Sequence, residues 1–216
     1  MAERNHEKPK TPRARRSPLL FALVLTAILG AYALDNRGVF SPTEALPTFA
    51  TIPAFSLTDQ RNQTLTHEDL RGGIWIANFI FTRCPTVCPA FTAKMQQLRR
   101  RTDEAGIKTR SVSFSVDPDY DTPAVLNDYA TRFEADADTW SFLTGSLDDI
   151  KRTVSDGLKI AMGGHQPDGN FAGIFHGSHF VLVDAANTIR GYYDANDAEA
   201  MDKLLSDTAA LADEAL

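Results

Sequence analysis

Cysteine is scarce in this chain: Cys84 and Cys88 are the only two among 216 residues. At most one disulfide can therefore form within the chain. Internal repeats and low-complexity tracts are also lacking, which excludes repeat architectures and leaves one compact domain as the expectation for residues 51–216.

An excess of basic residues is lacking as well. The chain has 22 Lys and Arg against 28 Asp and Glu. Residues 1–16 hold six of the basic and two of the acidic ones, so the remainder has 16 against 26, a balance of −10. A domain of this charge has no electrostatic footprint for nucleic acid, and no nucleic-acid partner is expected.

Residues 17–34 contain no charged side chain and are rich in Leu, Val and Ala. Such a run, after the basic residues 1–16, predicts a cytoplasmic tail (1–16) and a single transmembrane anchor (17–34). The rest of the chain is then expected in the periplasm, attached to a bacterial inner membrane. The alternative is a cleaved signal peptide, because Ala31-Tyr32-Ala33 resembles a cleavage site. No cysteine lies near the run, which excludes lipoprotein anchoring.

Residues 35–50 lack periodicity and are predicted to be a linker, whereas residues 51–216 predict an α/β domain. The expected strands are 55–57 and 63–65, paired as a hairpin, then 74–81, 109–116, 140–143, 180–183 and 188–193. The expected helices are 89–103, 122–133, one beginning at Ser146, and 195–212. This order is typical of a thioredoxin-like fold with an N-terminal β-hairpin. It places the cysteines at the carboxyl end of a central strand, where α/β sheets carry their sites.

The two cysteines lie four residues apart, which is one helical turn, so both sulfurs can reach one metal ion or each other. Pro89 is suited to the first position of the following helix. The helix start is then expected beside Cys88, and its positive dipole end should favour the thiolate there. A single structural disulfide is the alternative, but the small loop it would close contributes little stability.

Five histidines are candidates for a third metal ligand: His6, His67, His165, His176 and His179. The first is in the cytoplasmic tail, the second is expected at the exposed start of a short helix, and the third lies in a Gly-rich loop. His176 and His179 immediately precede the strand 180–183, which should run beside the cysteine loop. The residues alone leave the choice between these two open.

Asp117 and Asp121 follow the predicted strand 109–116. Their expected role is to cap the helix 122–133, and the alternative is a charge near the cysteine site.

Three ordered motifs, FTRCPTVCP (81–89), SVDPDYDTP (115–123) and HGSHFVLVD (176–184), resemble the Sco/SenC family. That family consists of membrane-anchored copper-binding proteins involved in cytochrome c oxidase assembly. The resemblance implies a copper site, for Cu(I) and Cu(II), formed by Cys84, Cys88 and one histidine about four residues before the aromatic of the last motif. That position is His176. The chain departs from the family in having Gly177 directly after this histidine, where Ser or Thr is usual.

The resemblance implies a copper chaperone that delivers copper to the dinuclear copper site of a terminal oxidase. Its partners would be the copper-binding subunit of that oxidase and a copper donor protein. The alternative is a membrane-anchored thiol–disulfide reductase that keeps the cysteines of the oxidase site reduced. A peroxidase is the weakest alternative, because no Thr stands three residues before either cysteine.

Overall fold

The computed structural model describes residues 45–162 and 178–214, within a compact unit Ala45–Leu216. The predicted tail (1–16) and anchor (17–34) lie outside the described residues. In the part of the chain that is described, no helix is both long enough and apolar enough to cross a membrane.

The strands are β1 (Ser56–Asp59), β2 (Thr64–Thr66), β3 (Ile74–Ile80), β4 (Thr109–Ser115), β5 (Trp140–Thr144), β6 (His179–Val183) and β7 (Ile189–Asp194). The helices are α2 (His67–Leu70), α3 (Val87–Glu104), α4 (Pro123–Arg132), α5 (Leu147–Lys151) with its π-helical continuation η1 (Arg152–Gly157), and α6 (Ala198–Glu214). The predicted strands and helices are therefore confirmed, with ends shifted by a few residues. The last helix begins at Ala198 because Asp194 and Asp197 form a turn, with an Asp197 N–H···O Asp194 bond of 3.0 Å.

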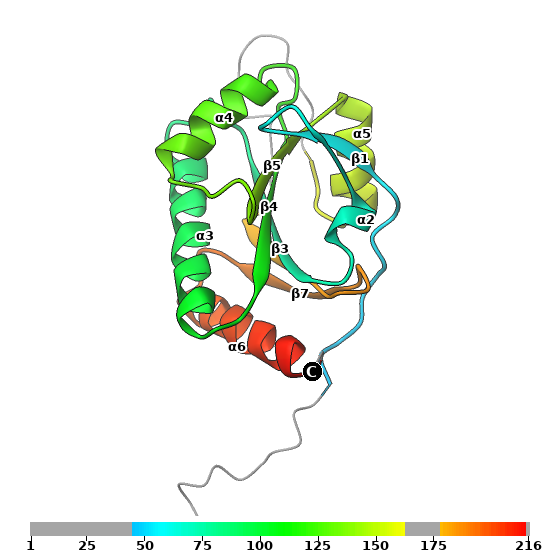
Figure 1. Cartoon of the computed structure of the whole chain (residues 1–216), viewed down its shortest axis with the longest axis vertical. Helices are drawn as coiled ribbons and strands as arrows, with labels where there is room; N and C mark the ends of the chain where they lie inside the picture. The colour runs from blue at the N-terminus through cyan, green and yellow to red at the C-terminus, as the bar shows by residue number, and fades with distance from the viewer. Residues whose placement is uncertain (1–44, 163–177, 215–216) are drawn as a thin grey trace, which may run out of the picture. The chain divides into compact units, whose positions relative to one another are not determined.

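The strands form one mixed sheet in the order β2-β1-β5-β4-β3-β6-β7. β3 pairs in parallel with β4 and antiparallel with β6, so the chain leaves β3 between the end of β4 and the beginning of β6 (Figure 1). The predicted N-terminal hairpin is confirmed by the antiparallel pairing of β1 with β2.

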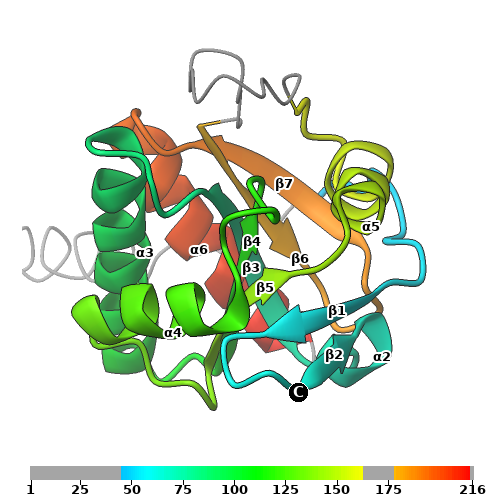
Figure 2. The ribbon, with the colours of Figure 1, turned by 90° about the horizontal axis from the view of Figure 1, so that it is seen from above.

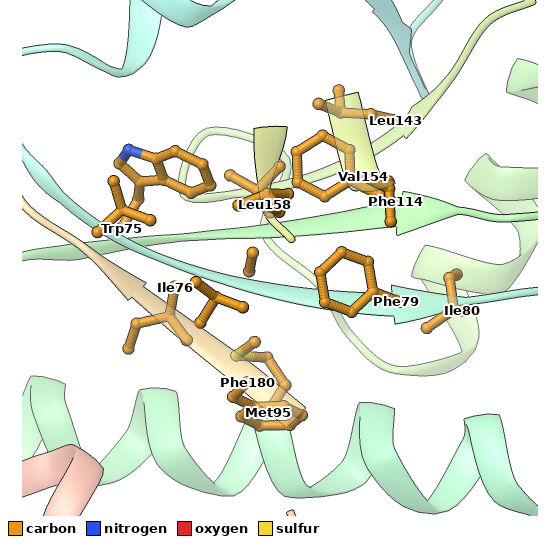
Figure 3. Close-up of a cluster of buried hydrophobic side chains, with 14 of the residues drawn as sticks. Trp75, Ile76, Phe79, Ile80, Met95, Phe114, Leu143, Val154, Leu158 and Phe180 are labelled. Carbon is orange, nitrogen blue, oxygen red and sulfur yellow. The ribbon is translucent and has the colours of Figure 1, made fainter. Parts of the chain in front are cut away.

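Helices cover both faces of the sheet. α3, α4 and α6 lie on one face, and α5 with η1 lies on the other (Figure 2). Met95 of α3 packs on one side of β3, while Val154 and Leu158 pack on the other (Figure 3). All seven residues of β3 are consequently buried, which is the pattern of a strand covered on both faces.

Residues 45–52 lie against the outer edge of β7. The Phe49 N–H donates to Ile189 O at 3.0 Å, and the Ile189 N–H donates to Ala50 O at 2.8 Å. The Arg190 guanidinium donates to the carbonyls of Leu46 and Pro47 at 2.8 and 3.0 Å. Since Ile189 begins β7 and Asp194 ends it beside His179, this contact is at the end of the sheet remote from the cysteines.

Candidate metal centre

The two cysteines lie where β3 passes into α3. Cys84 is in the loop after Ile80, and Cys88 is the second residue of α3. Both are free thiols. Cys84 is 8% exposed and Cys88 is fully buried, so Cys84 is the more accessible of the two residues.

The sulfur of Cys84 caps helix α3. Its Sγ accepts the Cys88 N–H at 3.4 Å, whereas Thr86, the residue at the N-cap position, makes no side-chain capping bond. The first N–H groups of a helix have no partner within it, and together they carry its positive dipole end. Partial burial acts to raise the pKa of Cys84, but hydrogen bonds from the N–H groups of Cys88, Thr86 and Val87 outweigh burial and hold that pKa below its ordinary value.

The pKa of Cys88 is shifted in the opposite direction. Burial raises the pKa of its thiol well above the ordinary value, although the Phe81 N–H donates to its sulfur at 3.5 Å. The prediction that the helix dipole favours the Cys88 thiolate is therefore wrong. α3 begins at Val87 rather than at Pro89, so Cys88 lies inside the first turn and its N–H points at Cys84.

The first turn of α3 is braced by α4. Thr92 Oγ1 donates to the carbonyl of Cys88 at 2.9 Å, and the Tyr129 hydroxyl lies 2.8 Å from Thr92 Oγ1. Both side chains are buried. The backbone at Cys88 is thus held by a hydrogen-bonded chain that starts on a second helix.

The buried carboxylate of Asp121 holds the loop that carries Cys84 by hydrogen bonds. Asp121 is completely buried and accepts hydrogen bonds from Ser115 Oγ at 2.6 Å and from the N–H of Thr82 at 3.1 Å, and it also accepts from the Thr82 hydroxyl. Burial raises the pKa of Asp121, against the lowering effect of these bonds. The carboxylate therefore ties the end of β4 to the residue two positions before Cys84.

Asp117 binds the residue next to Cys84. Its Oδ2 accepts from Arg83 Nη2 at 2.6 Å, and the Arg83 guanidinium lies 4.5 Å from the centre of the Tyr120 ring. The prediction that Asp117 and Asp121 cap the next helix is wrong, because the Thr122 hydroxyl caps α4 by accepting the Val125 N–H. Their alternative role, charge beside the cysteine site, is what the contacts show. The Asp117 Oδ1 atom is buried and lacks a hydrogen-bond partner in the described part of the chain.

The predicted third ligand, His176, lies outside the described residues, as does His165. His179 is the first residue of β6, opposite Asp194 of β7. No three His, Cys, Asp or Glu side chains gather as a metal site within residues 45–162 and 178–214, so His179 does not join the two cysteines there. The assignment of His176 stays a prediction. His67 is half-buried at the start of α2 and contacts Glu68 at 3.0 Å.

Thr82, Arg83 and Ser115 are the supporting residues that sequence reasoning did not single out. A signal for them was present, because predicted parallel neighbours end at the same edge of a sheet. The polar residues that follow the strands 74–81 and 109–116 should then meet, as Thr82 and Asp121 do.

Comparison with known proteins bears on this site. Residues 43–213 match the model of the SCO1/SenC family. The chain belongs to this family. The SCO1 protein homolog of Bacillus subtilis is 32% identical over 157 residues, covering 72% of this chain and 80% of the relative.

Two solved structures are similar in fold. BsSco, described as a member of the Sco family of cytochrome c oxidase assembly proteins with a disulfide switch, is 30% identical, with a TM-score of 0.68 over 77% of this chain and 95% of that one. ScoI of Bradyrhizobium japonicum with copper bound is 23% identical, with a TM-score of 0.62 over 75% and 99%. The thioredoxin-like α/β fold predicted from the sequence is thus confirmed, and the Sco family includes proteins with bound copper.

The unequal environments of the two thiols make a testable prediction. In the reduced protein, the Cys88→Ser variant keeps only Cys84, and we expect iodoacetamide to alkylate it at pH 7 more than about tenfold faster than the Cys84→Ser variant, because one pKa unit changes the thiolate fraction about tenfold. The rate for Cys84 should also reach its plateau below the pH at which an unperturbed thiol does. Repeating the reaction in urea controls for folding: unfolded variants should react alike, and a faster Cys88 in the folded protein would contradict the assignment.

The hydrogen bonds of Asp121 lead to a second prediction. Asp121→Ala leaves the donors of Thr82 and Ser115 without their acceptor, so we expect the free energy of unfolding to fall by about 1–3 kcal/mol, measured by urea denaturation. Asp128→Ala, which removes an exposed carboxylate from α4, is the matched control and should change stability by less than about 0.5 kcal/mol. Equal losses in the two variants would refute the bracing role.

Proposed function

We propose that this protein carries copper to the dinuclear copper site of a terminal cytochrome c oxidase during assembly of the oxidase. The observation that carries the proposal is the pair of free thiols one helical turn apart in a chain of the Sco family. The pKa of one of them, Cys84, is lowered, which favours its thiolate. Copper is cargo in this function. It is received from a donor protein and passed to the copper-binding subunit of the oxidase.

The donor set suits copper. Two thiolates and an imidazole form a soft set that binds Cu(I) and accommodates Cu(II). Cys84 and Cys88 would supply the sulfurs and His176 the imidazole. A structural zinc site normally closes with four protein ligands, whereas this set offers three and leaves copper open to a receiving ligand.

The segments before the domain complete the proposal. Residues 1–16 would stay in the cytoplasm and residues 17–34 would span the bacterial inner membrane. The linker predicted over 35–50 would then end before Ala45, because residues 45–50 already belong to the compact unit that would be the copper-binding domain in the periplasm. The charge pattern supports this orientation, since basic residues precede the apolar run.

A second function is favoured by the thiol pair itself. A thiol–disulfide reductase needs an accessible thiolate to attack and a second thiol, shielded from solvent, to resolve the mixed disulfide. Cys84, with its lowered pKa, and the buried Cys88 meet these two requirements. The same protein could thus keep the receiving cysteines of the oxidase reduced.

The copper proposal is tested by anaerobic titration of the reduced protein with Cu(I). We expect one copper ion per chain, and we expect Cys84→Ser or Cys88→Ser to abolish the binding, because no other thiol is present. The oxidised protein, with Cys84 and Cys88 joined, should bind none, since a disulfide offers no thiolate. Tight one-to-one binding by the double Cys→Ser protein would place the site elsewhere and refute the proposal.

The third ligand is tested separately. We expect His176→Ala to weaken Cu(II) binding and to shift the Cu(II)–thiolate absorption band, because an imidazole ligand is lost. His179→Ala is the matched control and should leave both unchanged, since within residues 45–162 and 178–214 His179 does not gather with the two cysteines. A loss confined to His179→Ala would contradict the assignment, and equal small losses would indicate a site formed by the two thiolates alone.

A further inference from the structure

Large apolar side chains are exposed beside the reactive sulfur. In the described part of the chain, the exposed large hydrophobic side chains are Phe49, which lies at the remote end of the sheet, and Val87 and Tyr120, with exposed fractions of 55%, 45% and 46%. Val87 is in the first turn of α3, between Cys84 and Cys88 in the sequence, and Tyr120 is in the loop after β4. Two of the three thus lie at the end of the sheet that carries the site.

Any partner that reacts at this site must contact that surface. Only 8% of Cys84 is exposed and none of Cys88. Disulfide exchange requires a sulfur of the partner to come within bonding distance of Cys84, and metal transfer requires a shared ligand there. Val87 lies three residues from Cys84, and Tyr120 lies under the guanidinium of the adjacent Arg83. We therefore expect a polypeptide that reaches the sulfur to contact both side chains.

Among the described residues 82–93, the Arg83 guanidinium is the positive charge, and it is engaged within the domain. Residues 84–93 contain no ionisable side chain apart from the two thiols. The Arg83 guanidinium is bound by the buried Asp117 at 2.6 Å and stacked on Tyr120, which also fixes the position of that ring. We call the exposed residues Pro85, Thr86, Val87 and Tyr120 the cysteine collar.

Acidic side chains lie at the end of the sheet that carries the cysteine collar. Asp119 is exposed next to Tyr120. Asp194 and Asp197 lie where β7 ends, and this is the same end of the sheet, because Asp194 pairs with His179 at the beginning of β6. Residues 17–216 as a whole carry 26 acidic against 16 basic residues. A partner with basic residues around its contact surface is therefore favoured over an acidic one.

We propose that the cysteine collar and Asp119 form the docking surface for the partner polypeptide, and that the loop which that partner presents is apolar at its thiols and flanked by Lys or Arg. This inference rests on the proposed function, in that the partner exchanges copper or a disulfide with Cys84. It adds the residues that recognise the partner and the chemistry of the segment that they recognise.

The test uses disulfide exchange with two synthetic peptides. Each has one internal disulfide between apolar residues, and the pair differs only in flanking Lys or flanking Glu. The Cys84 thiolate attacks one probe sulfur and releases the other as a thiolate; Cys88 then loses its proton and attacks Cys84. The products are the Cys84–Cys88 disulfide and the reduced peptide, so two electrons pass from the protein to the probe. Each rate is divided by the rate of 2-mercaptoethanol with the same peptide, which removes the intrinsic reactivity of the probe.

With the full chain in mild detergent at low ionic strength, we expect the Lys-flanked peptide to react about tenfold faster than the Glu-flanked one. The ratio should approach one near 1 M salt, where the screening length is about 3 Å. Asp119→Lys should abolish the preference. Asp213→Lys, which makes the same charge change at the far end of α6, should retain it. Equal normalised rates for the two peptides, or an equal effect of the two variants, would overturn the charge preference.

The apolar part of the surface is tested with Val87→Ser and Tyr120→Ser. We expect each to slow both peptides about fivefold while leaving the rate with bis(2-hydroxyethyl) disulfide unchanged, because that small probe needs no docking surface. Phe49→Ser, at the exposed apolar residue beside β7, is the control and should slow neither probe. Unchanged peptide rates in the two collar variants would refute the docking surface, whereas a loss of rate with the small probe as well would mean that the thiol itself was altered. Copper stoichiometry of the same variants is read independently, so a failure of the proposed function is distinguishable from a failure of docking.

Discussion

The parallel pairing of β3 with β4 is the constraint on which the rest of the site depends. β3 is buried along its whole length, so its position in the sheet is fixed by packing on both faces. Its carboxyl end therefore meets the carboxyl end of β4, and the loop that carries Cys84 lies on the loop that carries Asp117 and Asp121. The hydrogen bonds from Thr82 and Arg83 to those carboxylates follow from this arrangement.

Chemistry and structure are coupled at the Cys84 sulfur. The same atom is the accessible nucleophile and the acceptor that caps α3. Anything that removes negative charge from it, whether a proton, a metal or a second sulfur, weakens its hydrogen bonds with the first turn of the helix. Because Cys88 lies in that turn, a change at one sulfur reaches the backbone of the other. The bonds from Tyr129 through Thr92 to the Cys88 carbonyl oppose such movement.

The sequence was sufficient to predict the order of the strands and helices, since alternating and helical apolar patterns dominate from β1 to α6. The prediction from spacing that both cysteines lie at the carboxyl end of a central strand is also confirmed, whereas their role as metal ligands stays a prediction. The predictions that were wrong concern the local structure around the cysteines. Whether α3 begins at Val87 or at Pro89 depends on a capping atom that comes from a cysteine, and proline fits the first turn at either position. The buried state of Asp121 could not be derived, because carboxylates after a strand normally cap the next helix. Only the neighbouring strand, distant in sequence, decides its partners.

Because Cys84 is more exposed than Cys88, a partner would reach Cys84 first in both proposed functions. In the part of the chain that the structure describes, Cys84 retains some exposure and Cys88 has none, so a receiving thiol would approach from the side of Cys84. For copper, Cys84 would be the protein ligand nearer the receiving protein, and Cys88 would be the ligand shielded from solvent. For a disulfide, the same difference in exposure means that the mixed intermediate forms at Cys84 and is resolved from within by Cys88. A chain built in this way needs no separate active sites for metal transfer and thiol reduction, because in each a partner would reach Cys84 first.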